Sequence, residues 1–503
     1  MSVLERLRAL PDGALQGMRR GIEKESLRVR PDGSLAQTLH PAALGSALTH
    51  PHITTDFSES QLELITAPQP SVEACLAELT EIHQVVYKAI GEEILWCASM
   101  PCNLPADNLI PIGRYGTSNV GRAKTVYRLG LAHRYGRRMQ AISGIHYNFS
   151  VPGVGTEEYF GLIRNFRRDS WLLLYLFGAS PAVCSSFVAG REHQLTQLAP
   201  GTHYAPYATS LRMGRLGYQS DAQASLTVSY NNLRDYTASL YDALTQPYPA
   251  YEKIGIREGD DYKQLNTTLL QIENEFYSSV RPKRRIRRGE RPLHALRERG
   301  VEYVEVRLMD LDPFAPIGIT AQTCRFLDLF LLGCLLTESP PDTPREIREI
   351  RDNLQTVAQR GREPGLLLAR NGSEARAADW ARETLLECEP LAEALDRRLG
   401  GAAYRDAYET QAKVLADPAE TPSARVLHAM ARNHENSFVR FALIESTLHK
   451  GTLQHQELAR EVRERFAQLA QESILKQRDL EASDEMDFES FRQRYLAYDA
   501  LRV

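Results

Sequence analysis

The sequence predicts an α+β protein whose sheet is largely antiparallel. Over the first two-thirds of the 503-residue chain, short runs of β-branched and aromatic residues alternate with helical stretches. The separations between the expected strands vary too widely for a regular βαβ repeat, which argues against a parallel sheet. An apolar fraction of 43% and a charged fraction of 25% are typical of a globular protein.

Each expected element follows from its local pattern of apolar residues. Period-two patterns predict strands over residues 20–30, 60–66, 142–151, 225–230 and 301–308. Helical periodicity predicts helices over residues 72–93, 121–140, 156–175, 232–244 and 322–337. The apolar run from Phe326 is interrupted by Asp328 and is shorter than the roughly 20 residues that span a bilayer. We therefore expect a buried helix there.

The composition changes after the proline-rich stretch TESPPDTPRE, residues 337–346. We expect a boundary there, with an α+β domain over residues 1–341 and a mostly helical region over residues 342–503 that packs on it. Amphipathic patterns predict helices over residues 344–360, 373–398, 402–416, 422–448 and 453–482. Charged runs such as PREIREIRDNL are expected to be solvated helix faces.

Charge and cysteine content narrow the functional classes. A formal net charge of −4 gives no drive toward nucleic acid or an anionic membrane. The N-terminal residues lack the apolar core of a signal peptide. Seven cysteines without a CxxC pair fit a reducing compartment, so we expect a cytoplasmic protein.

The stretch GTSNVGRAKT from Gly116 is similar to a phosphate-binding loop but departs from it. Arg122 and Ala123 stand between the second glycine and Lys124, where the motif requires the lysine at once. We expect a loop that leads into a helix, with Arg122, Lys124 and Arg128 on its surface. A nucleotide would have to be held in another way.

Carboxylates in strand-like runs offer that alternative. In RGIEKESLRV, Glu23 and Glu25 would share one strand face and repel each other. A divalent cation, which prefers oxygen ligands and bridges carboxylates to phosphates, would relieve the repulsion. Solvated strand edges remain the alternative for these glutamates, and a hydrogen-bonded core histidine remains the alternative for His146 in SGIHYNFSV.

The basic stretch of residues 270–291 leaves three interpretations open. It could follow a nucleic-acid backbone, form a solvated loop, or use Arg281 or Lys283 to neutralise a bound phosphate. The acidic net charge and the lack of a nucleic-acid-binding motif disfavour the first.

Long collinear strings between residues 16 and 335 carry a family resemblance. RGIEKESLRV, TTDFSESQLELIT, YGTSNVGRAKTVYRLGL, ISGIHYNFS, QIENEFYSSVRPKR and GVEYVEVRLMDLDPFAPIG resemble glutamate–cysteine ligases of the proteobacterial class, also called γ-glutamylcysteine synthetases. The resemblance implies a glutamine synthetase-like funnel built on a curved, mainly antiparallel sheet. It implies ATP-dependent formation of γ-glutamylcysteine from L-glutamate and L-cysteine through a γ-glutamyl phosphate, without a P-loop. We expect no additional ATP-grasp domain.

The resemblance also assigns site residues one by one. It implies two or three Mg²⁺ ions, with Mn²⁺ as a substitute, held by Glu23, Glu25, Asp56, Glu63, His146 and Glu305. Arg307 would stabilise the transferring phosphoryl group, and Glu305 would share its catalytic role. Glutamate would contact Arg212, Gln140 and Ile142, and cysteine would contact Phe57, Tyr127, Leu131, Tyr218 and Tyr277. Lys283 and Arg284 are assigned to the nucleotide from their charge alone.

Two rival functions remain at this point. One is a carboxylate–amine ligase of the same superfamily with another amine acceptor, and the other is a non-catalytic, nucleotide-binding regulatory protein. We further expect a monomer that binds neither nucleic acid nor membrane and that glutathione inhibits in competition with glutamate.

Overall fold

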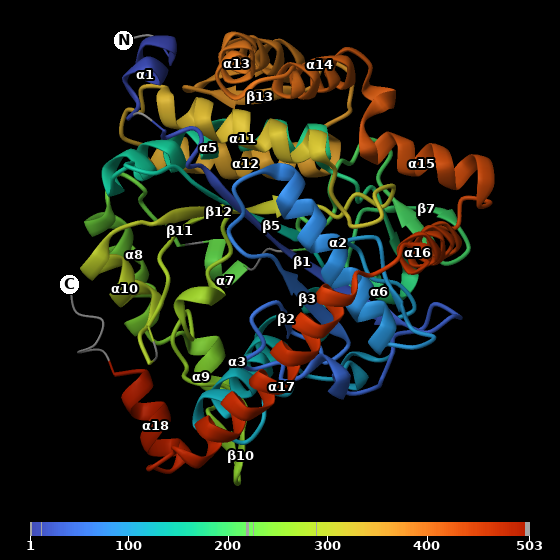
Figure 1. The fold of residues 1–503 in the computed structure, drawn as a ribbon, viewed down its shortest axis with the longest axis vertical. Helices are drawn as coiled ribbons and strands as arrows, with labels where there is room; N and C mark the ends of the chain where they lie inside the picture. Colours follow the sequence, from blue (N-terminus) through green and yellow to red (C-terminus); the bar gives the residue numbers. More distant parts are fainter. Residues whose placement is uncertain (1–2, 12, 218–220, 225, 288, 498–503) are drawn as a thin grey trace.

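A seven-stranded antiparallel sheet lies at the centre of the computed structural model, which describes residues 3–11, 13–217, 221–224, 226–287 and 289–497 (Figure 1). The strand order is β11-β12-β5-β1-β3-β2, and β4 pairs with β1. The strands are β1 (Arg19–Val29), β2 (Ile53–Thr55), β3 (Gln61–Ile65), β4 (Ile94–Leu95), β5 (Ile145–Ser150), β11 (Val280–Lys283) and β12 (Tyr303–Met309). The predicted α+β class with an antiparallel sheet is confirmed.

One face of the sheet is apolar and is covered by helices. Ile22, Tyr147 and Val306 stand opposite one another on β1, β5 and β12, and all three are fully buried. Three helices pack on this side: α2 (Val72–Ala89), α5 (Thr156–Phe177) and α11 (Ala321–Leu336). Helices α13 (Ala377–Leu399) and α14 (Ala403–Ala416) form an outer layer on α11. The strands present their carboxylates on the opposite face, whereas Arg20 of β1 points to the helix side and pairs there with Asp328 of α11.

Capping residues define where the helices begin. Ser118 Oγ accepts a hydrogen bond from Gly121 N at the start of α3 (Asn119–Tyr135). Thr343 Oγ1 accepts one from Glu346 N at the start of α12 (Pro344–Arg360), where proline occupies the first turn.

Five predicted elements differ from the structure. Gly136 divides the helix expected over residues 121–140 into α3 and α4 (Arg137–Gln140), and the helix expected over residues 453–482 begins at Arg460. Residues 226–230, within the expected strand 225–230, are irregular, and residue 225 lies outside the described residues. The expected helix 422–448 is divided into α15 (Pro422–Asn433) and α16 (Phe438–His455), because Glu435 and Asn436 adopt positive φ angles of 52° and 59° that no helix accommodates. Ser373–Arg376 forms strand β14, which pairs with β13 (Leu367–Arg370) before α13 begins.

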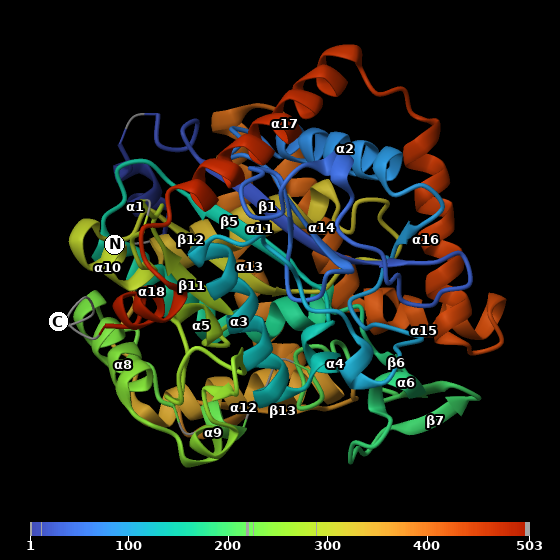
Figure 2. The same cartoon turned by 90° about the horizontal axis from the view of Figure 1, so that it is seen from below.

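The remaining elements surround this framework. Helix α17 (Arg460–Ala482) crosses the molecule beside α2, and α18 (Phe488–Tyr495) packs against α3 (Figure 2). The other helices are α1 (Val3–Ala9), α4 (Arg137–Gln140), α6 (Ser185–Val188), α7 (Asp221–Ala224), α8 (Leu233–Thr245), α9 (Pro249–Ile254) and α10 (Pro292–Arg299). The other short strands outside the central sheet are β6 (Ala182–Cys184), β7 (Thr196–Ala199), β8 (Thr202–Tyr204), β9 (Arg257–Glu258) and β10 (Asp261–Tyr262). None of the described helices is both long enough and apolar enough to cross a membrane.

The hydrophobic core is continuous across the predicted domain boundary. Leu329 of α11 and Leu391 of α13 belong to one buried cluster with the apolar side chains of the sheet. The division at residues 341–342 stays a prediction.

A disulfide joins Cys102 and Cys184, which are 82 residues apart in sequence. The other five cysteines are buried thiols. The sequence alone does not predict this pairing, because the spacing of cysteines does not reveal which of them meet in space.

Asp328, the charged residue inside the apolar run from Phe326, is fully buried on α11 and contacts residues of the sheet on one side and of α14 on the other. Its carboxylate lies 2.8 Å from Arg20 Nη2 of β1 and accepts hydrogen bonds from the hydroxyls of Tyr147 at 2.7 Å and Tyr404 at 3.2 Å. A buried charge is tolerated when partners of this kind surround it.

We expect Asp328→Asn to destabilise the protein by about 3 kcal/mol or more, because it leaves the Arg20 guanidinium buried without a counter-charge. The urea midpoint measures this change. Glu73→Gln is the matched control. It breaks an exposed ion pair between Glu73 of α2 and Arg325, which lies on α11 like Asp328. The control should cost about 1 kcal/mol or less. Equal effects of the two variants would contradict the role given to Asp328.

Candidate active site

The register of four strands gathers five of the six predicted metal ligands on one face, and the sixth, Asp56, lies just after β2. Residues directly opposite each other in antiparallel strands have side chains on the same face. The opposed pairs are Glu25 with Glu63, Glu23 with His146, and Asn148 with Glu305. Side chains from β3, β1, β5 and β12 thus form one row across the sheet.

One half of this row has the geometry of a cation site. Ligand atoms of Glu23, His146 and Glu305 all lie within 4.8 Å of one another. His146 Nδ1 lies 3.0 Å from Glu23 Oε2, and Asn148 Nδ2 donates a hydrogen bond of 2.9 Å to Glu23 Oε1. Two carboxylates and an imidazole at this spacing fit one divalent cation.

The other half concentrates negative charge in a buried place. Burial raises the pKa of Glu63 well above its ordinary value, and the nearby carboxylates of Glu23, Asp56 and Glu25 raise it further. Burial, together with the charge of Asp56, raises the pKa of Glu25 to about 8. Carboxylates crowded in this way cost free energy unless a cation compensates them. The donor set therefore fits the Mg²⁺ ions that the resemblance implies.

Glu305 is already bound by two cationic side chains. Lys283 Nζ donates to Glu305 Oε1 at 2.9 Å, and Arg307 Nη1 donates to Glu305 Oε2 at 2.9 Å. Although burial opposes its ionisation, these two cations hold the pKa of Glu305 well below its ordinary value. Lys283 thus lies at the carboxylate row, whereas the ion-pair partner of Arg284 is Glu302, 3.7 Å away.

Arg212 lies beside the row and is almost fully buried. Its Nη2 donates to the backbone carbonyl of Arg307 at 2.9 Å, and its Nη1 lies 3.8 Å from Asp310 Oδ1. A Cβ atom at Gly144 would collide with its guanidinium, so any larger residue there would displace the Arg212 side chain. The backbone N–H of Gly144 donates to Glu25 Oε2 at 2.8 Å, which links Arg212 to the acidic face.

The residues predicted to contact glutamate and cysteine are described except for one. Gln140 Nε2 donates to the hydroxyl of Tyr277 at 2.7 Å, so these two side chains meet. The carbonyl of Ile142 accepts a hydrogen bond of 3.0 Å from Gln61 Nε2. Phe57, Tyr127 and Leu131 lie on the loop after β2 and on α3, and Tyr218 lies outside the described residues.

Two cations that the sequence analysis assigned to the surface face the site instead. Arg128 Nε donates to the carbonyl of Asp56, and its guanidinium lies 4.4 Å from the centre of the Tyr115 ring. Lys124 Nζ lies 5.2 Å from the same ring, and burial, together with the charge of Arg128, lowers its pKa to about 8. The i,i+4 spacing of Lys124 and Arg128 was the signal that could have placed both on one helix face.

The second glycine of the P-loop-like stretch serves helix packing. A Cβ atom at Gly121 would collide with the carbonyl of Tyr115, which α3 approaches closely. The expectation of a loop that leads into a helix is confirmed, and only the surface position of Lys124 and Arg128 is wrong.

The basic stretch of residues 270–291 is largely neutralised by neighbouring groups. The guanidinium of Arg281 donates to the carbonyls of Asn274 and Phe276, and Arg291 pairs with Glu273 at 2.8 Å. Lys283 points to Glu305, as described above. This pairing favours neither a nucleic-acid groove nor a freely solvated loop.

A cavity of about 660 Å³ opens beside Arg212, Arg307 and Tyr277. Its volume lies within the range of pockets that bind small molecules. The candidate site therefore combines an acidic sheet face with an adjoining space that substrates can enter.

Comparison with known proteins identifies relatives over nearly the whole chain. Residues 4–357 match the model of the glutamate-cysteine ligase family. A glutamate–cysteine ligase of Alcanivorax borkumensis is 47% identical over 96% of this chain and 96% of its own length. A glutamate–cysteine ligase of Pseudomonas entomophila is 51% identical over 95% of this chain and 93% of its own.

Two solved structures share this architecture. The glutamate–cysteine ligase of Francisella tularensis, determined in complex with AMP, superposes with a TM-score of 0.91 at 38% identity, covering 96% of this chain and 98% of its own. A bifunctional glutathione synthetase of Pasteurella multocida gives a TM-score of 0.72 at 26% identity. That match covers 93% of this chain and 57% of the bifunctional protein.

We expect Glu63→Gln to raise the melting temperature of the metal-free protein by about 1–3 °C, because glutamine avoids the free-energy cost of burying an ionisable group among other carboxylates, a cost that the raised pKa of Glu63 reflects. The same variant should lose part of the stabilisation that Mg²⁺ with an ATP analogue gives the unaltered protein. Thermal unfolding with and without these ligands measures both effects.

Glu59→Gln is the control for this prediction. Glu59 is also buried, but its two oxygens accept hydrogen bonds of 2.8 Å from the backbone N–H groups of His40 and Arg114. Its replacement should lower the melting temperature. A fall of similar size in Glu63→Gln would show that Glu63 is likewise satisfied without a cation.

Proposed function

This chain belongs to the glutamate–cysteine ligase family, and we propose that its acidic sheet face is where the γ-carboxylate of L-glutamate is joined to the amine of L-cysteine at the expense of ATP. The observation that carries the proposal is the strand register that sets Glu25 opposite Glu63 and Glu23 opposite His146. Carboxylates are brought together at such cost where they hold cations that in turn hold phosphates.

The chemistry requires activation of a poor acyl donor. An oxygen of the glutamate γ-carboxylate attacks the γ-phosphorus of ATP, and ADP leaves. The cysteine amine, after losing a proton from its ammonium form, attacks the carbonyl carbon of the γ-glutamyl phosphate. The C–O bond to phosphate breaks, and γ-glutamylcysteine and phosphate are released. The protein's contribution to such a reaction is mainly positioning and neutralisation of charge.

We propose that Glu23, His146 and Glu305 hold one Mg²⁺ ion and that Glu25, Asp56 and Glu63 serve one or two more. Bound Mg²⁺ would neutralise phosphate oxygens and orient the γ-phosphoryl group. The crowding described for these carboxylates supports this assignment, since the group lacks internal compensation on the side of Glu63.

The cations around the row are proposed to act on the substrates. Arg307 and Lys283, which both bind Glu305, are placed to exchange that contact for a transferring phosphoryl oxygen. Arg212 would hold the α-carboxylate of glutamate with its planar fork. Gln140 and Ile142 would line that subsite.

The cysteine subsite is proposed between the loop after β2, helix α3 and Tyr277. Apolar walls from Phe57 and Leu131 would receive the small thiol side chain. The hydroxyls of Tyr127 and Tyr277 would meet its carboxylate.

Inhibition by glutathione, the oligomeric state and the cellular location are proposals that rest on the family resemblance and the sequence. Glutathione contains a γ-glutamyl group, so it would compete with glutamate for the same subsite. A monomeric state and a cytoplasmic location are proposed from the sequence. The crystallised Francisella relative contains AMP, and this supports an adenine nucleotide as the co-substrate here.

Release of ADP in a coupled assay tests the proposed function. We expect release to require glutamate, cysteine, ATP and Mg²⁺ together. A panel of other amino acids as acceptors tests the rival ligase, and a clear preference for another amine would overturn the cysteine assignment. Nucleotide binding without any turnover would favour a regulatory protein.

Glu305→Gln should lower kcat by about 100-fold or more while the protein still folds, because it removes a charge that holds Lys283 and Arg307 without changing the side-chain volume. Glu302→Gln is the matched control on the same segment. Glu302 pairs with Arg285 at 3.0 Å, outside the carboxylate row, and its replacement should change kcat by no more than about twofold. Near-normal turnover in Glu305→Gln would remove this residue from the proposed machinery.

A further inference from the structure

Helix α12 separates two cavities of opposite charge. Its glutamates Glu346 and Glu349 line a cavity of about 340 Å³, whereas Arg348 and Arg351 line the cavity of about 660 Å³ beside the candidate site. Ile350 contributes to both walls. The charges of PREIREIRDNL are thus divided by sign between two cavities, and Arg348, Arg351 and Asp352 remain exposed, as expected for solvated helix faces.

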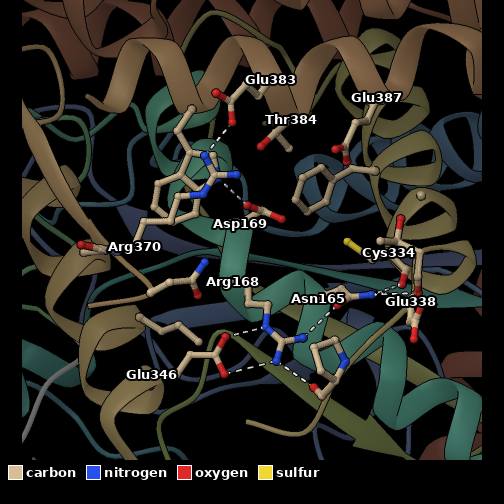
Figure 3. A pocket seen from close by; sticks show the side chains of 18 of the residues that line it. Asn165, Arg168, Asp169, Cys334, Glu338, Glu346, Arg370, Glu383, Thr384 and Glu387 are labelled. Atoms are coloured by element: carbon tan, nitrogen blue, oxygen red, sulfur yellow. Dashed lines mark hydrogen bonds and ion pairs between the residues drawn. The ribbon is translucent and has the colours of Figure 1, made fainter. Parts of the chain in front are cut away.

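The smaller cavity has no spare positive charge among its described lining residues. Figure 3 shows Arg168 held by both carboxylate oxygens of Glu346, at 2.6 and 3.2 Å, and Arg370 held by Glu383 at 2.6 Å. These two arginines are the cations of the wall, and six acidic residues share it. An anion would find no partner there.

The larger cavity has the opposite balance. Seven arginines and one aspartate line its described part. Arg307 is paired with Glu305 and Arg167 with Asp342. For Arg215 and Arg348, the described part of the chain contains no ion-pair partner.

Apolar walls strengthen this positive potential. Leu226, Val228, Phe276 and Leu354 line the same space and exclude water from part of it. Clefts with charges of one sign and low-dielectric walls raise the local concentration of oppositely charged ligands. The cavity extends from exposed Arg348 on α12 to buried Arg212 beside the acidic face.

We propose that this arginine-lined cavity is the entry path for the dicarboxylate substrate, and that Arg348 of α12 draws it toward Arg212. This inference rests on the proposed function. Glutamate carries two carboxylates and a single ammonium group, so it gains more from an excess of arginines than cysteine does. The path ends at the arginine proposed to hold its α-carboxylate. Helix α12 is thereby part of the substrate-binding structure, and the family match, which extends to residue 357, includes most of it.

Steady-state kinetics of Arg348→Glu test the proposal. At low ionic strength the KM for glutamate should rise about fivefold, which is the effect expected for reversing one exposed charge several ångströms from a ligand. The kcat should stay within about twofold of that of the unaltered protein. At about 0.5 M salt the effect should shrink to twofold or less. The KM for ATP should not change.

Arg345→Glu is the matched control. It makes the same change of net charge on the same helix, but Arg345 lies outside the lining of both cavities and pairs with Glu349 at 3.5 Å. The KM for glutamate in this variant should stay within twofold of the unaltered protein.

The outcomes separate this inference from the proposed function. Equal KM values in the two variants, an effect that salt does not reduce, or a rise in the KM for ATP instead of glutamate would overturn the entry path while leaving the ligase activity in place. An unaltered protein without glutamate-dependent release of ADP would overturn both.

Discussion

The repulsion among carboxylates on one sheet face is the constraint on which the rest of the structure depends. Antiparallel pairing fixes which residues face each other, so a shift of one strand by a single residue would turn its acidic side chains into the apolar core. The opposite face prevents such a shift. Ile22 and Tyr147 are buried there under α2, α5 and α11, and Arg20 is anchored by Asp328. The helical layers thus stabilise a register that the charged face by itself would disfavour.

Charge compensation divides the site into two unlike parts. Glu305 is satisfied by Lys283 and Arg307, and its pKa is depressed although burial opposes its ionisation. Glu63 is surrounded by other carboxylates, and its pKa is raised. A site of this kind is partly assembled before ligands arrive, and the ligands supply the missing charge. The arginine-lined cavity beside it extends the same principle, because its excess of positive charge suits an anionic substrate.

Local patterns in the sequence predicted the central strands and the residues that they carry. The alternation in RGIEKESLRV was sufficient to place Glu23 and Glu25 on one face, and the register then added their partners. Contacts between distant segments were beyond such patterns. The site-facing position of Lys124 and Arg128 depends on how α3 packs on Tyr115, and the Cys102–Cys184 bond depends on a loop meeting the end of strand β6. The division of the helix expected over residues 422–448 depends on two residues with positive φ, which no periodicity reveals.

Anomalous diffraction from crystals grown with Mn²⁺ and a non-hydrolysable ATP analogue would locate the cations on the acidic sheet face, because Mn²⁺ substitutes for Mg²⁺ at oxygen-rich sites. We expect one manganese peak among Glu23, His146 and Glu305, and at least one more at the side of Glu25 and Glu63, each in contact with phosphate oxygens. Nucleotide bound elsewhere, or bound at this face without manganese at the carboxylate row, would contradict this expectation.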